Sequence, residues 1–290
     1  MKMNSESLGT LQNSETLNAL KISEAERIQQ TAATPAPGVK DVCIFLSAYA
    51  AWLLGSAATC IRIEKNVKRM AEAWQTSVDM VIMPSHVQMV VWDRAHEHSY
   101  SNTECIRHTG ISFHINTRLS KLSWEVTDRR ISFEEAQTQF IDIQHTPVEN
   151  QRFVLIMASL ANASFCRLFD GDIPSMIIVF IATLAGYRLK QLLLGRWHVD
   201  VRCVFFLCAF FSAVIGAAGH VFGIGETPQT ALATSVLYLI PGIPYINSVS
   251  DLLDGHYLSA YARFMNAAVL TACLSAGLCG GLLLMNLNWF

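Results

Sequence analysis

Two prolines interrupt an otherwise apolar stretch late in the chain. Pro241 and Pro244 flank Gly242 in the sequence PGIP. A proline removes a backbone N–H donor from a helix and frees the carbonyl one turn earlier, which here would free the carbonyls of Leu237 and Ile240. Hydrocarbon cannot satisfy such groups, so a broken helix at membrane depth occurs inside protein or beside a water-filled cavity. Transporters bind their substrates at such breaks.

Polar side chains follow the two prolines at helical spacing. Asn247 and Asp251 come about one and two turns after Pro244, and polar groups inside a membrane commonly mark a substrate or ion pathway. The stretch 237–256 therefore predicts part of a substrate path, with Asp251 near its mouth and Asp254 at the solvated end of the helix. A proline kink packed against a neighbouring helix is the structural alternative, and both remain open.

Three further polar residues lie in apolar runs and are added to the predicted path: Asn162, Arg167 and His220. Arg167 carries a fixed positive charge and would suit a carboxylate ligand. Because it lies near the end of its run, it could equally extend to the interface or pair with Asp170. His220 lies about one turn from the end of its run, so the membrane interface is an alternative place for it.

A group of histidines suggests a second kind of chemistry. The candidate metal ligands are His96, Glu97, His98, Cys105, His108 and His114. Side chains two apart on a strand point to the same face, so a zinc-dependent hydrolase tethered to the membrane is an alternative function. Against it, the sequence has no HExxH motif, no standard zinc-ligand spacing, no GxSxG nucleophile motif and no nucleotide-binding glycine loop. We therefore predict a protein that is not an enzyme and has no metal or cofactor.

The segments that must position these residues fall into two contrasting halves. Of the 290 residues, 52% are hydrophobic and only 15% are charged, against about 25% charged in typical soluble domains. Residues 1–150 hold 14 basic and 17 acidic side chains, and residues 151–290 hold 7 and 6. Neither half therefore has the basic surplus of a nucleic-acid binder.

The C-terminal half contains five apolar runs: 153–169, 173–194, 203–224, 230–250 and 264–287. Each run approaches or exceeds the ~20 residues that a transmembrane helix needs. The sequence therefore predicts a polytopic α-helical membrane protein, with a five-helix transmembrane domain over residues 151–290.

Basic residues alternate between the successive connections of this half. Lys and Arg occur before the first run, after the second and before the fifth, but are absent from the segments 170–172, 223–229 and 286–290. Because Lys and Arg are enriched in cytoplasmic loops, the pattern predicts a multi-pass protein of the cytoplasmic (inner) membrane. Its N-terminal part would lie in the cytoplasm and its C-terminus outside.

The N-terminal half is predicted to be a polar lead-in followed by a soluble domain. Residues 1–40 are expected to be disordered and to contain no signal peptide, and residues 41–150 to form a cytoplasmic α+β domain. The predicted helices are 41–54, 57–75, 116–129 and one that begins with a capping box at Ser132; the predicted strands are 78–84, 87–93 and 111–115. The eight cysteines include no CxxC pair and are interpreted as reduced, hydrophobic residues.

Four segments, taken in chain order, resemble the threonine/serine exporter family and especially its split-subunit branch. They are TCIRIEKNVKRMAEAW (59–74), VQMVVWD (87–93), NTRLSKLSWEVTDRRISFEEAQTQFIDI (116–143) and, within the apolar half, PGIPYINSVSDLLDGH (241–256). The resemblance covers about residues 41–285, and the Pro-Gly-x-Pro…Asn…Asp…Gly run is its most specific part. Arg62 and Glu64 form a supporting motif of the soluble domain. Ala260 stands where the family often has glycine, which puts helix packing there in doubt.

The resemblance implies a subunit of a membrane exporter for small metabolites. Single-chain members export threonine and serine, and split members export a dicarboxylate such as succinate together with a second small multi-span membrane subunit. An odd number of spans would suit pairing with such a subunit of inverted topology. A regulatory role for residues 41–150 is compatible with this function. The residues leave the substrate and the driving force open, because a carboxylate would need a base or a helix N-terminus, whereas a zwitterion would suit broken-helix carbonyls and Asp251.

Overall fold

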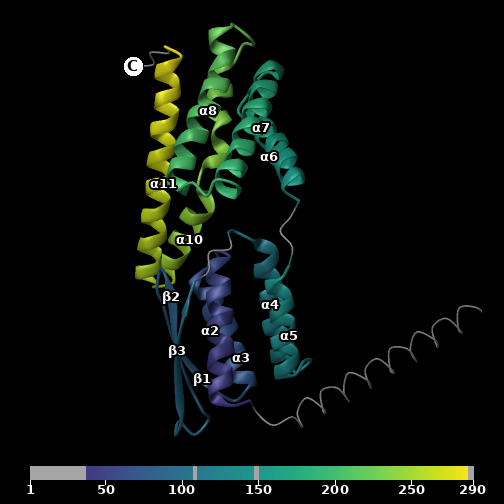
Figure 1. Ribbon diagram of the computed structural model, residues 1–290, viewed down its shortest axis with the longest axis vertical. Coiled ribbons are helices and arrows are strands. Elements are labelled where there is room, and N and C mark those ends of the chain that lie inside the picture. Colours follow the sequence, from purple (N-terminus) through teal and green to yellow (C-terminus); the bar gives the residue numbers. More distant parts are fainter. Residues whose placement is uncertain (1–36, 107–109, 147–149, 287–290) are drawn as a thin grey trace, which may run out of the picture. The chain divides into compact units, whose positions relative to one another are not determined.

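The computed structural model describes residues 37–106, 110–146 and 150–286, and the chain forms two compact units (Figure 1). The first, called the α+β unit below, runs up to Thr146 and also contains Ser250–Ser259. The second, called the helical unit, contains Pro147–Val249 and Ala260–Phe290. Residues 250–259, which fall within the predicted transmembrane part, thus pack with the α+β unit. The predicted disordered segment lies almost entirely outside the described residues.

The α+β unit contains a three-stranded antiparallel sheet. Its strands are β1 (Ser77–Ile82), β2 (His86–Trp92) and β3 (Ser99–Cys105), in the spatial order β1-β2-β3. The register pairs Ser77 with Trp92 at one end of the first hairpin and His86 with Cys105 at one end of the second. The first two strands overlap the predicted segments 78–84 and 87–93, because short apolar runs that contain valine and flank a turn with Pro84 are typical of strands.

The third strand differs from the prediction. Residues 111–115 were expected to be a strand, but helix α4 begins at Phe113, and the third strand is Ser99–Cys105. This strand reads SYSNTEC and lacks apolar alternation, so its sequence resembles a polar loop. Its backbone nevertheless pairs with β2 along its whole length, because ladder hydrogen bonds do not depend on apolar side chains.

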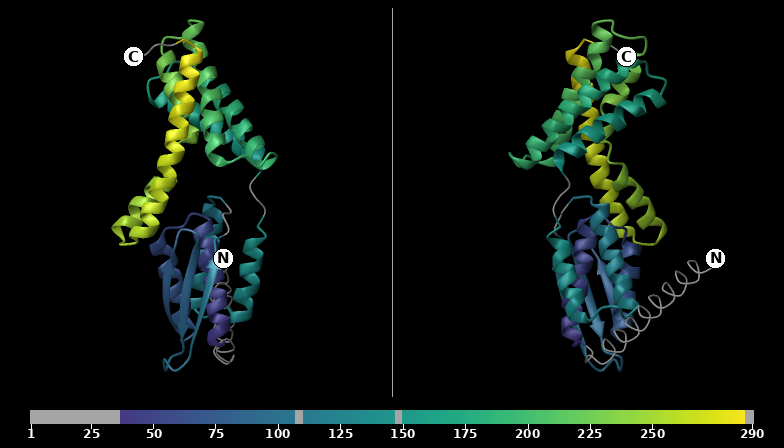
Figure 2. Two further views of the ribbon diagram at one scale, coloured as in Figure 1. Left: turned by 60° about the vertical axis from the view of Figure 1, so that its left-hand side comes forward. Right: turned by 90° about the vertical axis from the view of Figure 1, so that its right-hand side faces the viewer.

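The helices described for this unit lie on one side of the sheet (Figure 2). They are α2 (Val39–Gly55), α3 (Cys60–Ala73), α4 (Phe113–Thr127) and α5 (Phe133–Gln144). Helices α2 and α3 contact the strands, while α4 packs on α3 and α5 packs on α4. The predicted capping box is confirmed: the Ser132 hydroxyl accepts from the Glu135 N–H, and the Glu135 carboxylate accepts from the Ser132 N–H.

The helical unit is built from long apolar helices. In chain order they are α6 (Gln151–Leu168), α7 (Ile173–Gly195), α8 (Val201–Val221), α9 (Pro228–Ser235), the 3₁₀ turn η1 (Leu237–Leu239), α10 (Gly242–Leu253) and α11 (Tyr257–Leu284). Within the described residues α7, α8 and α11 are each long and apolar enough to cross a membrane, and the bent pair Pro228–Leu239 and Gly242–Leu253 could form a fourth span. Helix α6 is outside this set, so the structure supports three or four spans where the sequence predicted five.

The predicted break at the prolines is present. The two parts of the broken segment are bent by 61°. Ile240, with φ −60° and ψ 124°, is extended, as expected for a residue that precedes proline. Helix α10 then begins at Gly242, so Pro244 lies in its first turn, where a missing N–H breaks no intrahelical bond. Helix α9 thus ends at Ser235 and the 3₁₀ turn at Leu239, and a new helix begins at Gly242, directly after Pro241.

Candidate functional site

The backbone carbonyls near the break have local partners. The Leu237 carbonyl accepts from the Ile240 N–H at 3.1 Å, and the Ile240 carbonyl accepts from the Gly242 N–H at 2.9 Å. The sequence predicted that these two carbonyls would be freed by the prolines. Each carbonyl instead accepts one hydrogen bond within the tight turn. A carbonyl oxygen has a second lone pair, which can accept from another donor.

Asn162 joins two helices to the broken segment. Its side-chain amide donates to the Thr183 hydroxyl of α7 at 2.6 Å and to the Thr234 carbonyl of α9 at 3.0 Å. Only 4% of Asn162 is exposed. A buried amide of this kind is expensive unless it is hydrogen-bonded, so Asn162 fixes where α6, α7 and α9 meet. The sequence prediction identified this residue, but not its two partners.

A second polar contact lies where α7 and α8 meet η1. The Ser212 hydroxyl of α8 and the Tyr238 hydroxyl of η1 are 2.9 Å apart. Gly186 of α7 makes room for this pair, because a Cβ atom at that position would overlap both hydroxyl oxygens. The Tyr187 ring also contacts the Tyr238 ring, with centroids 5.9 Å apart. Two layers of polar groups thus hold α7 against the broken segment.

The other residues predicted near the break have simpler surroundings. Pro241 is buried, while Gly242, Pro244 and Asn247 are partly buried. Tyr245 of α10 contacts α11 through a 3.0 Å hydroxyl contact with Thr271. The prolines therefore shape the backbone and pack, whereas the polar contacts of the helical unit come mainly from α6, α7 and α8.

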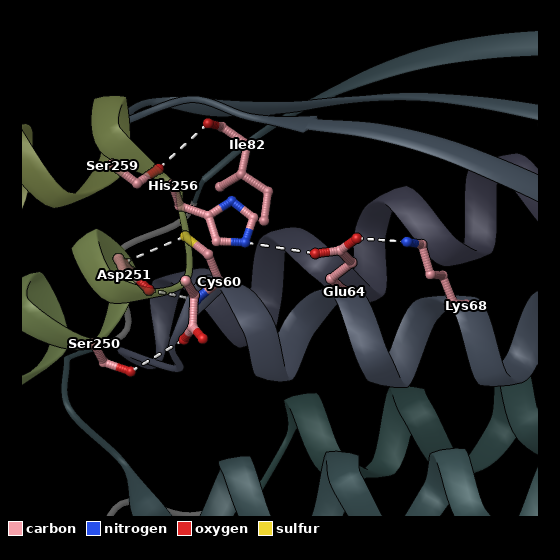
Figure 3. A network of polar contacts seen from close by, with 9 residues as sticks. Cys60, Glu64, Lys68, Ile82, Ser250, Asp251, His256 and Ser259 are labelled. Atoms are coloured by element: carbon pink, nitrogen blue, oxygen red, sulfur yellow. Dashed lines mark hydrogen bonds and ion pairs between the residues drawn. The ribbon is translucent and has the colours of Figure 1, made fainter.

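Asp251 binds the N-terminus of a helix in the α+β unit (Figure 3). One carboxylate oxygen accepts from the Cys60 backbone N–H at 2.8 Å, and the other lies 3.4 Å from the Cys60 thiol. Thr59, the N-cap residue of α3, forms no side-chain capping bond, and Asp251 is fully buried. A negative group at a helix N-terminus satisfies an unpaired N–H and interacts favourably with the helix dipole. Asp251 therefore acts as a cap for α3 from a distant part of the chain.

Glu64 of the predicted family motif contacts the same segment (Figure 3). Its carboxylate lies 3.5 Å from the His256 ring and forms an ion pair with Lys68. The hydrogen bond from Lys68 is the main reason why the pKa of Glu64 is lowered, and His256 adds to the effect. The Ser259 hydroxyl donates to the Ile82 carbonyl at 3.3 Å. Arg62, the other motif residue, is exposed.

The remaining predicted path residues lie at helix ends. Arg167, in the last turn of α6, donates to the Gly171 carbonyl at 3.1 Å, so it binds its own connection rather than Asp170. His220 is exposed in the last turn of α8, and both its path and its interface alternatives stay predictions.

The histidine group does not form a metal site in the described part of the chain. No group of three or more His, Cys, Asp or Glu side chains in those residues could hold a metal ion. His98 instead contacts Asp93 at 3.2 Å, and the His96 ring lies near the Ser77 hydroxyl. His108 lies outside the described residues. The arrangement gives no support to the zinc hydrolase alternative.

Residues 44–285 match the family described as "Putative threonine/serine exporter". The chain belongs to this family. The match includes both units and the whole broken segment, so the polar layers and the Asp251 cap are features of an exporter-family chain. Because the family consists of exporters, the long apolar helices indicate a multi-pass membrane protein.

Two relatives with assigned names are similar to a large part of the chain. The "Probable succinate transporter subunit YjjP" of Klebsiella aerogenes is 30% identical over 183 residues, which are 60% of this chain and 69% of the relative. The protein of the same name from Escherichia coli K12 is 32% identical over 170 residues, 58% of this chain and 65% of the relative. No solved structure matches the chain.

Proposed function

We propose that this chain is a subunit of an exporter that carries a small carboxylate metabolite, with succinate as the first candidate. The observation that carries the proposal is the broken segment α9-η1-α10, held by buried polar contacts from α6, α7 and α8 in an exporter-family chain. The names of the two relatives favour succinate over threonine and serine.

The substrate would pass along the surface where α7 faces the broken segment. Because Gly186 has no side chain, the backbone of α7 lies close to the Ser212–Tyr238 hydroxyl pair at this point. Asn162 would keep the break in place, because its amide links α6 to both α7 and α9. Hydroxyl and amide groups can exchange hydrogen bonds with a substrate at little cost when it replaces an internal partner. The sequence-based assignment of Asp251 to the path stays an untested alternative to its role as a cap, and the substitution Asp251→Asn distinguishes the two.

We further propose the five-span topology with a companion subunit. Helix α6 would be the fifth span despite its lower hydropathy, because Asn162 is satisfied inside the unit and Arg167 at its end. The α+β unit would lie in the cytoplasm and the C-terminus outside the inner membrane. Reporter fusions after Gly195 and His256 should then be cytoplasmic, and fusions after Gly171 and Glu226 external. A pull-down in mild detergent should recover a small multi-span membrane protein.

Transport in inside-out membrane vesicles tests the function directly. Vesicles from the native host should accumulate labelled succinate, and vesicles from a strain lacking this gene should not. Labelled threonine and serine are measured in parallel. Equal accumulation of all three compounds with and without the gene would refute the proposed function. Accumulation of threonine alone would support the export function and identify threonine, rather than succinate, as the substrate.

A further inference from the structure

Lys190 lies on the face of α7 that carries the polar contacts. Thr183, Gly186, Tyr187 and Lys190 are spaced i, i+3, i+4 and i+7, so they form one stripe along the helix. The first three members already face the broken segment and its neighbours, through Asn162, the Ser212–Tyr238 pair and the Tyr238 ring. By helix geometry Lys190 comes next on this stripe, about 5 Å beyond Tyr187.

The ammonium group of Lys190 is surrounded by aromatic rings rather than by anions. Its nitrogen lies 5.7 Å from the centre of the Tyr187 ring and 5.1 Å from that of the Phe205 ring. Among the described residues no carboxylate forms an ion pair with it. By contrast, Lys68 and Lys121 each have a glutamate four residues away as a partner. Lys190 is partly buried, so its charge is stabilised by the ring faces without being neutralised.

One of these rings, that of Tyr187, connects Lys190 to two hydroxyl groups. The Tyr187 ring contacts both the Lys190 ammonium and the Tyr238 ring, and the Tyr238 hydroxyl is paired with Ser212. In such a pair one hydroxyl donates to the other, and the second hydroxyl keeps its own hydrogen for a further acceptor. A cation, a free hydroxyl donor and aromatic walls together suit an anion with an apolar backbone.

We propose that Lys190 binds a carboxylate group of the exported metabolite at the broken segment, with the Ser212–Tyr238 pair as a second donor. This inference rests on the proposed export function and adds the group that recognises the substrate. An ammonium ion acts as a point charge that pairs readily with carboxylates. The substrate class that follows is a small organic anion, recognised through its charge rather than through broken-helix carbonyls.

A structural role for Lys190 makes a different prediction. Lysines near the end of a membrane helix commonly extend their charge to the interface, and Lys190 is five residues from Gly195, the last residue of α7. Arg188 provides a matched control, because it is a base on the same turn, is exposed, and donates a hydrogen bond to Gln191 within its own helix. An interface role would apply to both bases, whereas substrate binding would involve Lys190 alone.

The test uses inside-out vesicles from the native host in which the chromosomal gene carries Lys190→Met, Lys190→Arg or Arg188→Met. With labelled succinate, we expect Lys190→Met to raise KM at least tenfold at normal protein abundance, Lys190→Arg to raise it less, and Arg188→Met to leave it unchanged. Competition with unlabelled succinate and succinamide, its uncharged diamide, reports on recognition of charge. The preference for the charged compound should fall sharply in Lys190→Met. If threonine is the transported compound, the KM comparison is made with threonine.

Two results would overturn the inference while leaving the export function intact. One is a wild-type KM and a wild-type preference for succinate over succinamide in Lys190→Met. The other is an equal loss in Arg188→Met and Lys190→Met, which would identify both bases as interface anchors. Failure of the wild-type vesicles to transport any of the compounds would instead refute the export function itself.

Discussion

Two charged side chains in this protein are removed from water in different ways. Asp251 is fully buried, and its carboxylate accepts from the Cys60 N–H at the start of α3. Lys190 is partly buried, and its ammonium lies over two aromatic rings with no carboxylate partner among the described residues. The first charge has a protein partner of opposite polarity, and the second does not.

The difference separates a structural charge from one available to a ligand. A carboxylate that already caps a helix would have to break that contact before it could bind substrate, and the uncapped N–H would then be left unsatisfied. A cation held only by ring faces can accept an anion without losing a partner. The polar residue that the sequence makes most conspicuous, Asp251, is therefore the better structural element. The less conspicuous Lys190 is the better ligand.

The largest expected effect is on stability and follows removal of the Asp251 side chain. Asp251→Ala leaves the Cys60 N–H buried without its acceptor and removes a charged cap, which should lower the free energy of unfolding by about 2–4 kcal/mol. Thermal unfolding of the purified full chain in detergent measures the effect. Asp254→Ala is the control, because Asp254 is exposed in the same turn and its loss should change little. Equal unfolding temperatures for the two variants would contradict the capping role.

A smaller loss is expected at the close approach between α7 and η1. Gly186→Ala introduces a Cβ atom where the Ser212 and Tyr238 hydroxyl oxygens lie, so it should destabilise the protein by about 1–3 kcal/mol and reduce transport. Gly195→Ala, in the same helix, has nothing within 4 Å of its added Cβ atom and serves as the control. Transport and unfolding temperature are measured for both. Unchanged transport in Gly186→Ala would remove the polar layer at Tyr238 from the path.

The conservative substitution Asp251→Asn directly compares the two roles of this residue. Its amide oxygen can still accept from the Cys60 N–H, so we expect a loss of about 1 kcal/mol and continued transport. The sequence-based assignment of Asp251 to the substrate path predicts the opposite, namely loss of export in a stably inserted protein. Vesicle transport and unfolding temperature decide between the two roles. Lost transport at a nearly normal unfolding temperature would restore the path assignment.

The smallest effect is expected at the partly exposed pair of Glu64 and His256. Because the pKa of Glu64 is lowered in the folded protein from its ordinary value of 4.5, ionised Glu64 stabilises the fold above that pH. The stabilisation is lost as the pH falls through the folded pKa. Glu64→Gln should therefore unfold slightly more easily than the wild type at pH 7, by about 0.5 kcal/mol, and the difference should shrink as the pH falls below 4.5. If the stability difference between Glu64→Gln and the wild type grew towards acidic pH, the prediction would be contradicted.

The elements with strong local patterns could be predicted from the sequence. The strands Ser77–Ile82 and His86–Trp92 contain short apolar runs on either side of a turn with Pro84, and Ser132 with Glu135 forms a capping box that is readable from four residues. The break at Pro241 was predictable because proline acts on its own helix. Strand Ser99–Cys105 was missed because its pairing lies in the backbone, which no side-chain pattern reports.

The contacts of the candidate site were predictable only in part. Asn162 was identified as a costly polar residue in an apolar run, but its partner Thr183 lies on another helix. The stripe that ends at Lys190 was present in the sequence as a helical spacing. It was overlooked because a lysine near the end of an apolar run resembles an ordinary flanking base. The cap on Cys60 could not be inferred at all, since its two residues are 191 positions apart.

That separation has a consequence for how the protein is made. Cys60 leaves the ribosome long before Asp251, and at roughly 5–20 residues per second the interval is about 10–40 s. Throughout this time α3 lacks its cap, while most of the helical unit is synthesised and inserted. The α+β unit begins with the first residues translated, yet it is completed among the last. A chain cut short anywhere before Ser250 would thus carry an unfinished N-terminal fold, which quality-control proteases could detect.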